Sequence, residues 1–108
     1  MPKARKKGFY DTLANTAKQH AKNRFPNAKF ISVGSRNRGD FKRESDYDYR
    51  VEISDMDKSK FNDELIEYLK EKLKTHQGER IVIGSGANNN VVNIKPANGG
   101  KVSFYLKD

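Results

Sequence analysis

The sequence predicts an α+β domain in which one mixed sheet of about five strands carries two helices on one face. Three observations support this fold class: two segments with apolar residues at helical spacing, five short apolar stretches, and Gly/Asn-rich turns between the last three stretches. The 108 residues suit one domain, and no repeat or linker divides them. We therefore expect a single domain over residues 1–108, with residues 1–8 as a basic arm.

The two helices follow from apolar periodicity and from the residues that flank it. Apolar residues recur at every fourth position from residue 9 to residue 25, and Pro26 follows them, which predicts the first helix. Asp55 and Asp57 can cap a second helix. That helix is expected to end near His76 and Gly78, because glycine commonly follows the last turn of a helix.

The five strands are expected at residues 29–33, 46–53, 80–83, 91–94 and 102–106. The second of these alternates polar and apolar residues, which places Tyr47 and Tyr49 on the core face and Asp46 and Asp48 on the opposite face. Glycine- and asparagine-rich turns separate the last three strands, so we expect these to pair as antiparallel hairpins.

The net charge of +8 is unevenly distributed along the chain. Residues 1–24 hold seven basic side chains and one acidic side chain, Asp11, and so carry +6 of that total. Such asymmetry predicts contact with a polyanion such as nucleic acid, because neutralising phosphates releases counterions. A solubilising terminus is the alternative. The basic residues are Lys3, Arg5, Lys6, Lys7, Lys18, Lys22 and Arg24.

Composition excludes several other classes of protein. The chain has no cysteine, which rules out disulfides and thiolate zinc sites, and its two histidines lie on separate segments, which argues against a histidine metal site. No segment approaches the ~20 apolar residues of a membrane span, and no apolar run follows the basic start. We therefore expect a cytoplasmic protein with no membrane partner.

A loop suited to phosphate binding follows the first predicted strand. Gly34 allows the backbone to approach an anionic ligand closely, and the Ser35 hydroxyl can donate to phosphate oxygens. Arg36 and Arg38 can add charge-assisted hydrogen bonds to a triphosphate. The loop ends at Ser45, directly before an aspartate pair.

Asp46 and Asp48 form that pair, two residues apart on one strand. Their Cβ atoms should lie roughly 6.6 Å apart on the same face, close enough to share a cation. Magnesium takes one or two carboxylates and completes its coordination with phosphates and water. A solvated strand edge is the alternative for an isolated Asp-x-Asp, but the preceding Gly-Ser and basic loop favour the metal.

This stretch resembles the signature of the DNA polymerase beta nucleotidyltransferase superfamily, in particular its minimal nucleotidyltransferases. The shared pattern is Gly34-Ser35, ten intervening residues ending in Ser45, and Asp46-Tyr47-Asp48-Tyr49, within a likeness that covers residues 9 to about 95. The resemblance implies transfer of a nucleoside monophosphate from a magnesium nucleoside triphosphate to an acceptor hydroxyl. Ser35 would bind the β and γ phosphates, and Asp46 and Asp48 two Mg²⁺ ions, with Mn²⁺ as the alternative ion.

The acceptor is expected to be RNA, such as a tRNA end, because the basic N-terminal region suits a polyanion. A protein acceptor is the rival that the resemblance offers, since minimal members pair with small helical partner proteins in toxin–antitoxin systems. One small domain holds little that could select a substrate, so a partner protein or an oligomer is also expected.

Asn93 departs from the family pattern. The family places a third carboxylate on a later strand between hydrophobic residues, and the matching position here is Asn93, whose neutral oxygen can neither offset a metal's charge nor take a proton. Three explanations are open. Glu52, on the same face as Asp46 and Asp48, replaces the missing acid; the protein binds nucleotide with weak or no catalysis; or an acid has been replaced to inactivate the protein.

Overall fold

Two helices and six strands make up the described part of the chain, which in the computed structural model comprises residues 8–33, 47–54, 56–86, 90–97 and 99–107. Asp57 caps the second helix by accepting a hydrogen bond of 3.2 Å from the Lys60 backbone N–H, as predicted. The elements in chain order are α1 (Phe9–Arg24), β1 (Lys29–Val33), β2 (Tyr47–Glu52), α3 (Lys58–Lys72), β3 (Thr75–His76), β4 (Glu79–Ser85), β5 (Val91–Pro96) and β6 (Val102–Lys107).

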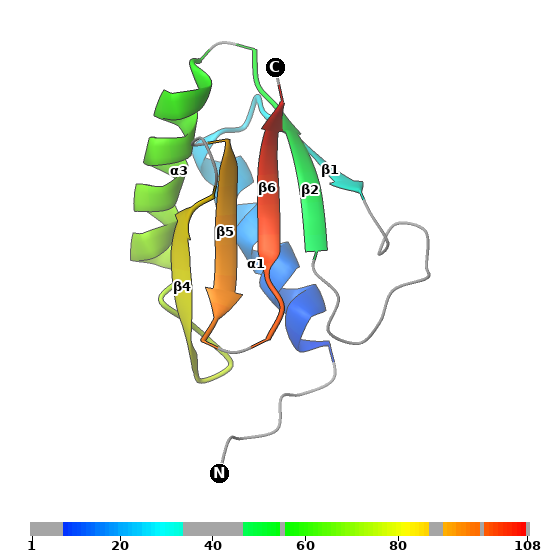
Figure 1. Ribbon diagram of the computed structural model, residues 1–108, viewed down its shortest axis with the longest axis vertical. Helices are drawn as coiled ribbons and strands as arrows, with labels where there is room; N and C mark the ends of the chain where they lie inside the picture. The colour runs from blue at the N-terminus through cyan, green and yellow to red at the C-terminus, as the bar shows by residue number, and fades with distance from the viewer. Residues whose placement is uncertain (1–7, 34–46, 55, 87–89, 98, 108) are drawn as a thin grey trace.

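The strands form one mixed sheet in the order β1-β2-β6-β5-β4-β3. The β2–β6 pair is parallel and the other pairs are antiparallel, which includes the two hairpins predicted among β4, β5 and β6. Figure 1 shows α1 behind the sheet and α3 along its β4 side. The predicted α+β class, with a mixed sheet and two helices on one face, is confirmed.

The expected strand count was one too low, because the second helix ends before the predicted position. Helix α3 stops at Lys72, and Thr75 and His76 instead pair with the start of β4. Gln77 and Gly78 connect these strands with φ of 50° and 84°, the pair of positive values that a tight hairpin turn requires. Gly78 therefore makes a hairpin turn, not the helix end expected from the sequence.

The alternation of β2 separates the core from the opposite face of the sheet. Tyr47, Tyr49 and Val51 are buried against the helices, while the residues between them are half-buried on the other face. Burial raises the pKa of Tyr49, and the Asp11 carboxylate adds to this effect, so its phenol stays neutral in the core.

Phe104 on β6 lies at the centre of the core. Its side chain is 0% exposed, and its ring makes edge contacts with Phe30 at 5.5 Å and with Tyr49 at 5.6 Å between centroids. Three neighbouring strands therefore meet in one aromatic cluster beneath the helices.

His76 joins β3 to α1. Its Nε2 lies 2.9 Å from the Thr12 hydroxyl, and its ring packs edge-on against Phe9 at 5.1 Å between centroids. Burial lowers the pKa of His76, against smaller opposing effects of a backbone hydrogen bond at Phe9 and the charge of Glu79. These contacts assign His76 a structural role.

Replacing Phe104 by Ala should lower the free energy of unfolding by about 3–5 kcal/mol, because a large ring leaves a cavity in the core. Urea denaturation followed by circular dichroism measures this. Tyr105→Ala is the matched control, since the next side chain points to the opposite face and is 42% exposed; its cost should stay below about 1 kcal/mol. Equal losses would contradict the assignment of the two faces.

Stability should fall as the pH is lowered from about 7.5 to about 5.5, because His76 binds a proton less readily in the folded chain than in the unfolded chain. The neutral His76 ring contributes fully to folding stability above pH 6.5, the ordinary pKa of histidine. This contribution is lost as the pH falls towards the lowered pKa of the folded chain. Urea denaturation at both pH values should show a smaller dependence in His76→Gln. If His76→Gln and the control His20→Gln showed the same pH dependence of stability, the attribution of that dependence to His76 would be wrong.

Candidate active site

Asp48, Ser103 and Asn93 lie in one row across three adjacent strands. Asp48 on β2 is in register with Ser103 on β6, which in turn is in register with Asn93 on β5. Paired residues share a face, so all three lie on the side of the sheet opposite the helices. With neighbouring strands about 4.8 Å apart, the Cα atoms of Asp48 and Asn93 are separated by roughly 10 Å.

Ser103 and Asn93 are directly connected. The Ser103 hydroxyl donates a hydrogen bond of 2.9 Å to the Asn93 Oδ1. Ser103 is fully buried although it lies on the side of the sheet opposite the helices. The Asn93 amide nitrogen lies against Gly86, where an added Cβ would come within 3.2 Å of it and within 2.9 Å of the Val91 Cβ. A larger residue at position 86 would therefore displace the neighbours of Asn93.

Glu52 is poorly placed to replace a third acid beside Asp48. It lies four residues further along β2, roughly 13 Å away, in register with Lys29 on β1. Its carboxylate forms an ion pair of 3.5 Å with Arg50. Two residues were candidates for the position of the third acid. Asn93 lies in the same row as Asp48, two strands away, whereas Glu52 lies at the other end of β2.

The remaining predicted nucleotide and metal residues lie outside the described part of the chain. The described residues on either side of residues 34–46 are Val33 and Tyr47, and Val33 is paired with Asp48. The chain therefore leaves β1 and enters β2 beside the row. The residues concerned are Gly34, Ser35, Arg36, Arg38, Ser45 and Asp46.

The described residues contain no cluster of three His, Cys, Asp or Glu side chains that could hold a metal ion. Asp48 contributes one carboxylate to the row, while Ser103 and Asn93 contribute a hydroxyl and an amide oxygen. Oxygen donors of this kind suit a hard cation such as Mg²⁺, which keeps water and phosphate ligands. These described donors suit one such ion; a second ion would find an amide at position 93 in place of an acid.

The basic residues predicted to contact nucleic acid divide between undescribed residues and α1. Lys3, Arg5, Lys6 and Lys7 lie outside the described ranges. Helix α1 carries Lys18, Lys22 and Arg24 and packs on the face opposite Asp48. Lys18 directs its Nζ over the Tyr49 ring, 5.9 Å from the centroid.

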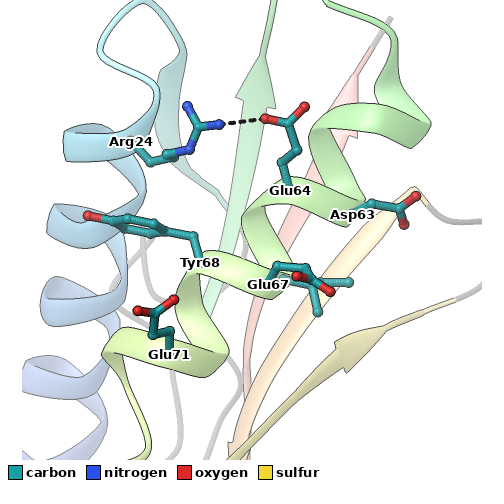
Figure 2. A pocket seen from close by; sticks show the side chains of 7 residues that line it. Arg24, Asp63, Glu64, Glu67, Tyr68 and Glu71 are labelled. Carbon is teal, nitrogen blue, oxygen red and sulfur yellow. Dashed lines mark hydrogen bonds and ion pairs between the residues drawn. The ribbon is translucent and has the colours of Figure 1, made fainter.

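Arg24 is engaged by an acidic groove between α1 and α3 (Figure 2). Its guanidinium forms an ion pair of 2.6 Å with Glu64, and the groove has a volume of about 620 Å³. The acidic lining reduces the attraction of this side of α1 for a polyanion. The acidic side chains that line the groove are Asp63, Glu64, Glu67 and Glu71.

None of the described helices has the length and apolar character that a bilayer span requires.

Comparison with known proteins identifies the family. A family model described as a nucleotidyltransferase domain matches residues 14–95. No curated protein sequence matches the chain.

Solved structures share the fold. A Cid1 poly(U) polymerase structure with Mg and 3′-dATP bound superposes with a TM-score of 0.65 at 18% identity, over 98% of this chain and 33% of that one. A Cid1 structure described for its RNA terminal uridylyl transferase activity has a TM-score of 0.63 at 16% identity, over 91% of this chain and 29% of that one. A structure of the GLD-2/RNP-8 complex has a TM-score of 0.60 at 17% identity, over 88% of this chain and 35% of the matched chain. The chain thus spans about a third of these proteins.

Proposed function

The chain belongs to the nucleotidyltransferase domain family, and we propose that it moves a nucleoside monophosphate from a nucleoside triphosphate to a hydroxyl of an RNA acceptor. Family membership confirms the resemblance seen in the sequence and the enzyme class that it implied. The row of Asp48, Ser103 and Asn93 carries the proposal, because it places position 93 across the sheet from the predicted metal-binding strand.

The nucleotide is proposed to bind where β1 and β2 meet. Gly34 and Ser35 bind its β and γ phosphates, and Arg36 and Arg38 offset the phosphate charge. Ser45 donates to the phosphate from the end of the loop.

Asp46 and Asp48 hold the magnesium of the nucleotide. When bound, Mg²⁺ offsets the charge that develops on the phosphoryl oxygens. Mn²⁺, with the same preference for oxygen ligands, is the alternative ion.

An RNA acceptor is supported by what the matched structures are: a poly(U) polymerase and an RNA terminal uridylyl transferase. One matched structure is also a complex of two proteins. With that complex as support, we propose that this chain acts together with a partner protein or a second copy. A small helical partner protein, as in toxin–antitoxin pairs, remains the alternative acceptor.

A second candidate function is nucleotide binding with little or no transfer, and Asn93 favours it. The Asn93 oxygen is neutral and already accepts a hydrogen bond from Ser103, so it is a weak ligand for a second ion and no base for the acceptor hydroxyl. The two functions make different predictions for the same variants.

Asp48→Asn should reduce transfer at least about 100-fold, because a metal ligand contributes several kcal/mol to catalysis. The assay incubates each radiolabelled nucleoside triphosphate with Mg²⁺ and total RNA, and separately with candidate partner proteins, and counts label in the acceptor. Glu52→Gln, which changes an acid at the far end of the same strand, is the matched control and should retain activity. Transfer that survives Asp48→Asn would overturn the assignment.

Asn93→Asp should raise transfer at least about tenfold, because it supplies an acid where a positioned base contributes roughly 10²–10⁴. The substituted carboxylate keeps the size of the amide and can still accept the Ser103 hydrogen bond, so the fold should tolerate it. Asn90→Asp adds the same charge next to β5 but outside the row, and should leave the rate unchanged. No gain in Asn93→Asp, with nucleotide binding retained, would favour the binding module.

A further inference from the structure

The sheet face that carries Asp48 is open, since none of the described helices covers it (Figure 1). Two large apolar side chains are exposed among the described residues, Tyr105 at 42% and Val82 at 50%. Both lie on this face, because their strand neighbours Phe104 and Ile83 point into the core. Val82 pairs with Lys95, four residues along β5 from the Val91 that faces Tyr105, so the two side chains lie apart and Tyr105 is the one near Asp48.

Tyr105 stands next to the Asp48 row. It is directly opposite Arg50 on β2 and Val91 on β5, and it lies two residues beyond Ser103 on β6. The two rows are therefore about 7 Å apart. A base resting on the Tyr105 ring leaves the sugar hydroxyl of its nucleotide within reach of Asp48.

The charges on this face favour a polyanion. Beside the acidic Asp48 and Glu52, the described strands place several basic residues on this face. Arg50 is paired with Glu52 at 3.5 Å between side chains that are both about 40% exposed, and such a pair contributes little stability. The guanidinium can therefore turn to a phosphate at low cost. The basic residues are Lys29, Arg50, Arg80 and Lys95.

We propose that this open face binds the single-stranded 3′ end of the RNA acceptor, with Tyr105 stacking on a base and Arg50 and Lys95 contacting phosphates. The inference rests on the proposed function and names the surface that delivers its acceptor. Single strands bind through aromatic platforms combined with cationic grooves, which is the combination found here. A protein occupant fits less well, because lysine is depleted in the centres of protein interfaces.

The proposal moves the acceptor contacts from the helix to the sheet. The basic residues predicted on α1 lie on the opposite face from Asp48, and Arg24 is held by Glu64. An RNA strand bound to α1 would have to pass around the edge of the sheet to reach Asp48. An RNA strand on the open face of the sheet reaches Asp48 directly.

Fluorescence anisotropy with a labelled single-stranded RNA of about ten nucleotides tests the proposal without nucleotide or transfer. Tyr105→Ala should weaken binding about 5- to 150-fold, the range for loss of one stacked base, and Tyr105→Phe should retain it. Tyr68→Ala, which changes a tyrosine in the groove between α1 and α3, is the matched control and should bind as the unaltered chain does. Thermal unfolding checks that each variant is folded.

The salt dependence separates stacking from charge. Lys95→Ala should reduce the slope of log affinity against log salt by about 0.7, as expected for one phosphate contact on a single strand. Tyr105→Ala should shift the affinity and keep the slope, because stacking releases no counterion.

Several results would overturn the proposal. These are absence of RNA binding by the unaltered chain, and affinity that falls in Lys18→Ala/Lys22→Ala but not in Tyr105→Ala. Binding of a fluorescent nucleoside triphosphate with Mg²⁺ is measured in parallel. Nucleotide binding without Tyr105-dependent RNA binding defeats this inference alone, while RNA binding without nucleotide binding or transfer defeats the proposed function.

Discussion

The pairing of β2 with β6 determines both the core and the candidate site. The two strands are parallel and in register from Tyr47–Val102 to Glu52–Lys107, although about fifty residues separate them in the chain. Because side chains alternate along a strand, this register sends Phe104 into the core and Ser103 to the opposite face. A slip of one residue would bury Tyr105 in place of Phe104 and separate Asp48 from Asn93.

The same register sets an electrostatic condition on position 93. An acid there would stand roughly 10 Å from Asp48 on a half-buried face, and without a cation the two charges would repel each other. Asparagine removes that repulsion, and its oxygen satisfies the buried Ser103 hydroxyl. An asparagine that would weaken the proposed second metal position therefore favours the sheet without metal, an example of the conflict between stability and activity.

Local patterns predicted much of this structure, and non-local pairing accounts for what they missed. The fourth-residue periodicity of α1 and the alternation of β2 are properties of short segments, so they could be interpreted correctly. The row that joins Asp48 to Asn93 through Ser103, and the distance of Glu52 from that row, depend on strand order, which no single segment encodes. Gln77 in a left-handed conformation concealed β3, since glutamine carries little turn signal. Ser103 and Tyr105 were missed because their strand was identified only by its apolar residues.

The division of the sheet into a helix face and an open face also changes how the basic charge is interpreted. On the helix side, the acidic lining of the groove between α1 and α3 neutralises the charge of Arg24. Part of the positive charge in residues 1–24 is therefore balanced within the molecule. Charge on that side can still raise the rate at which a polyanion approaches, because such attraction acts over a Debye length. Direct contacts at Asp48, however, would require groups on its own face, where Arg50 lies directly opposite the exposed Tyr105 and Lys95 lies on the other side of the Asp48 row. In the proposed function, the approach of a polyanionic acceptor and its placement at Asp48 would therefore depend on different basic residues.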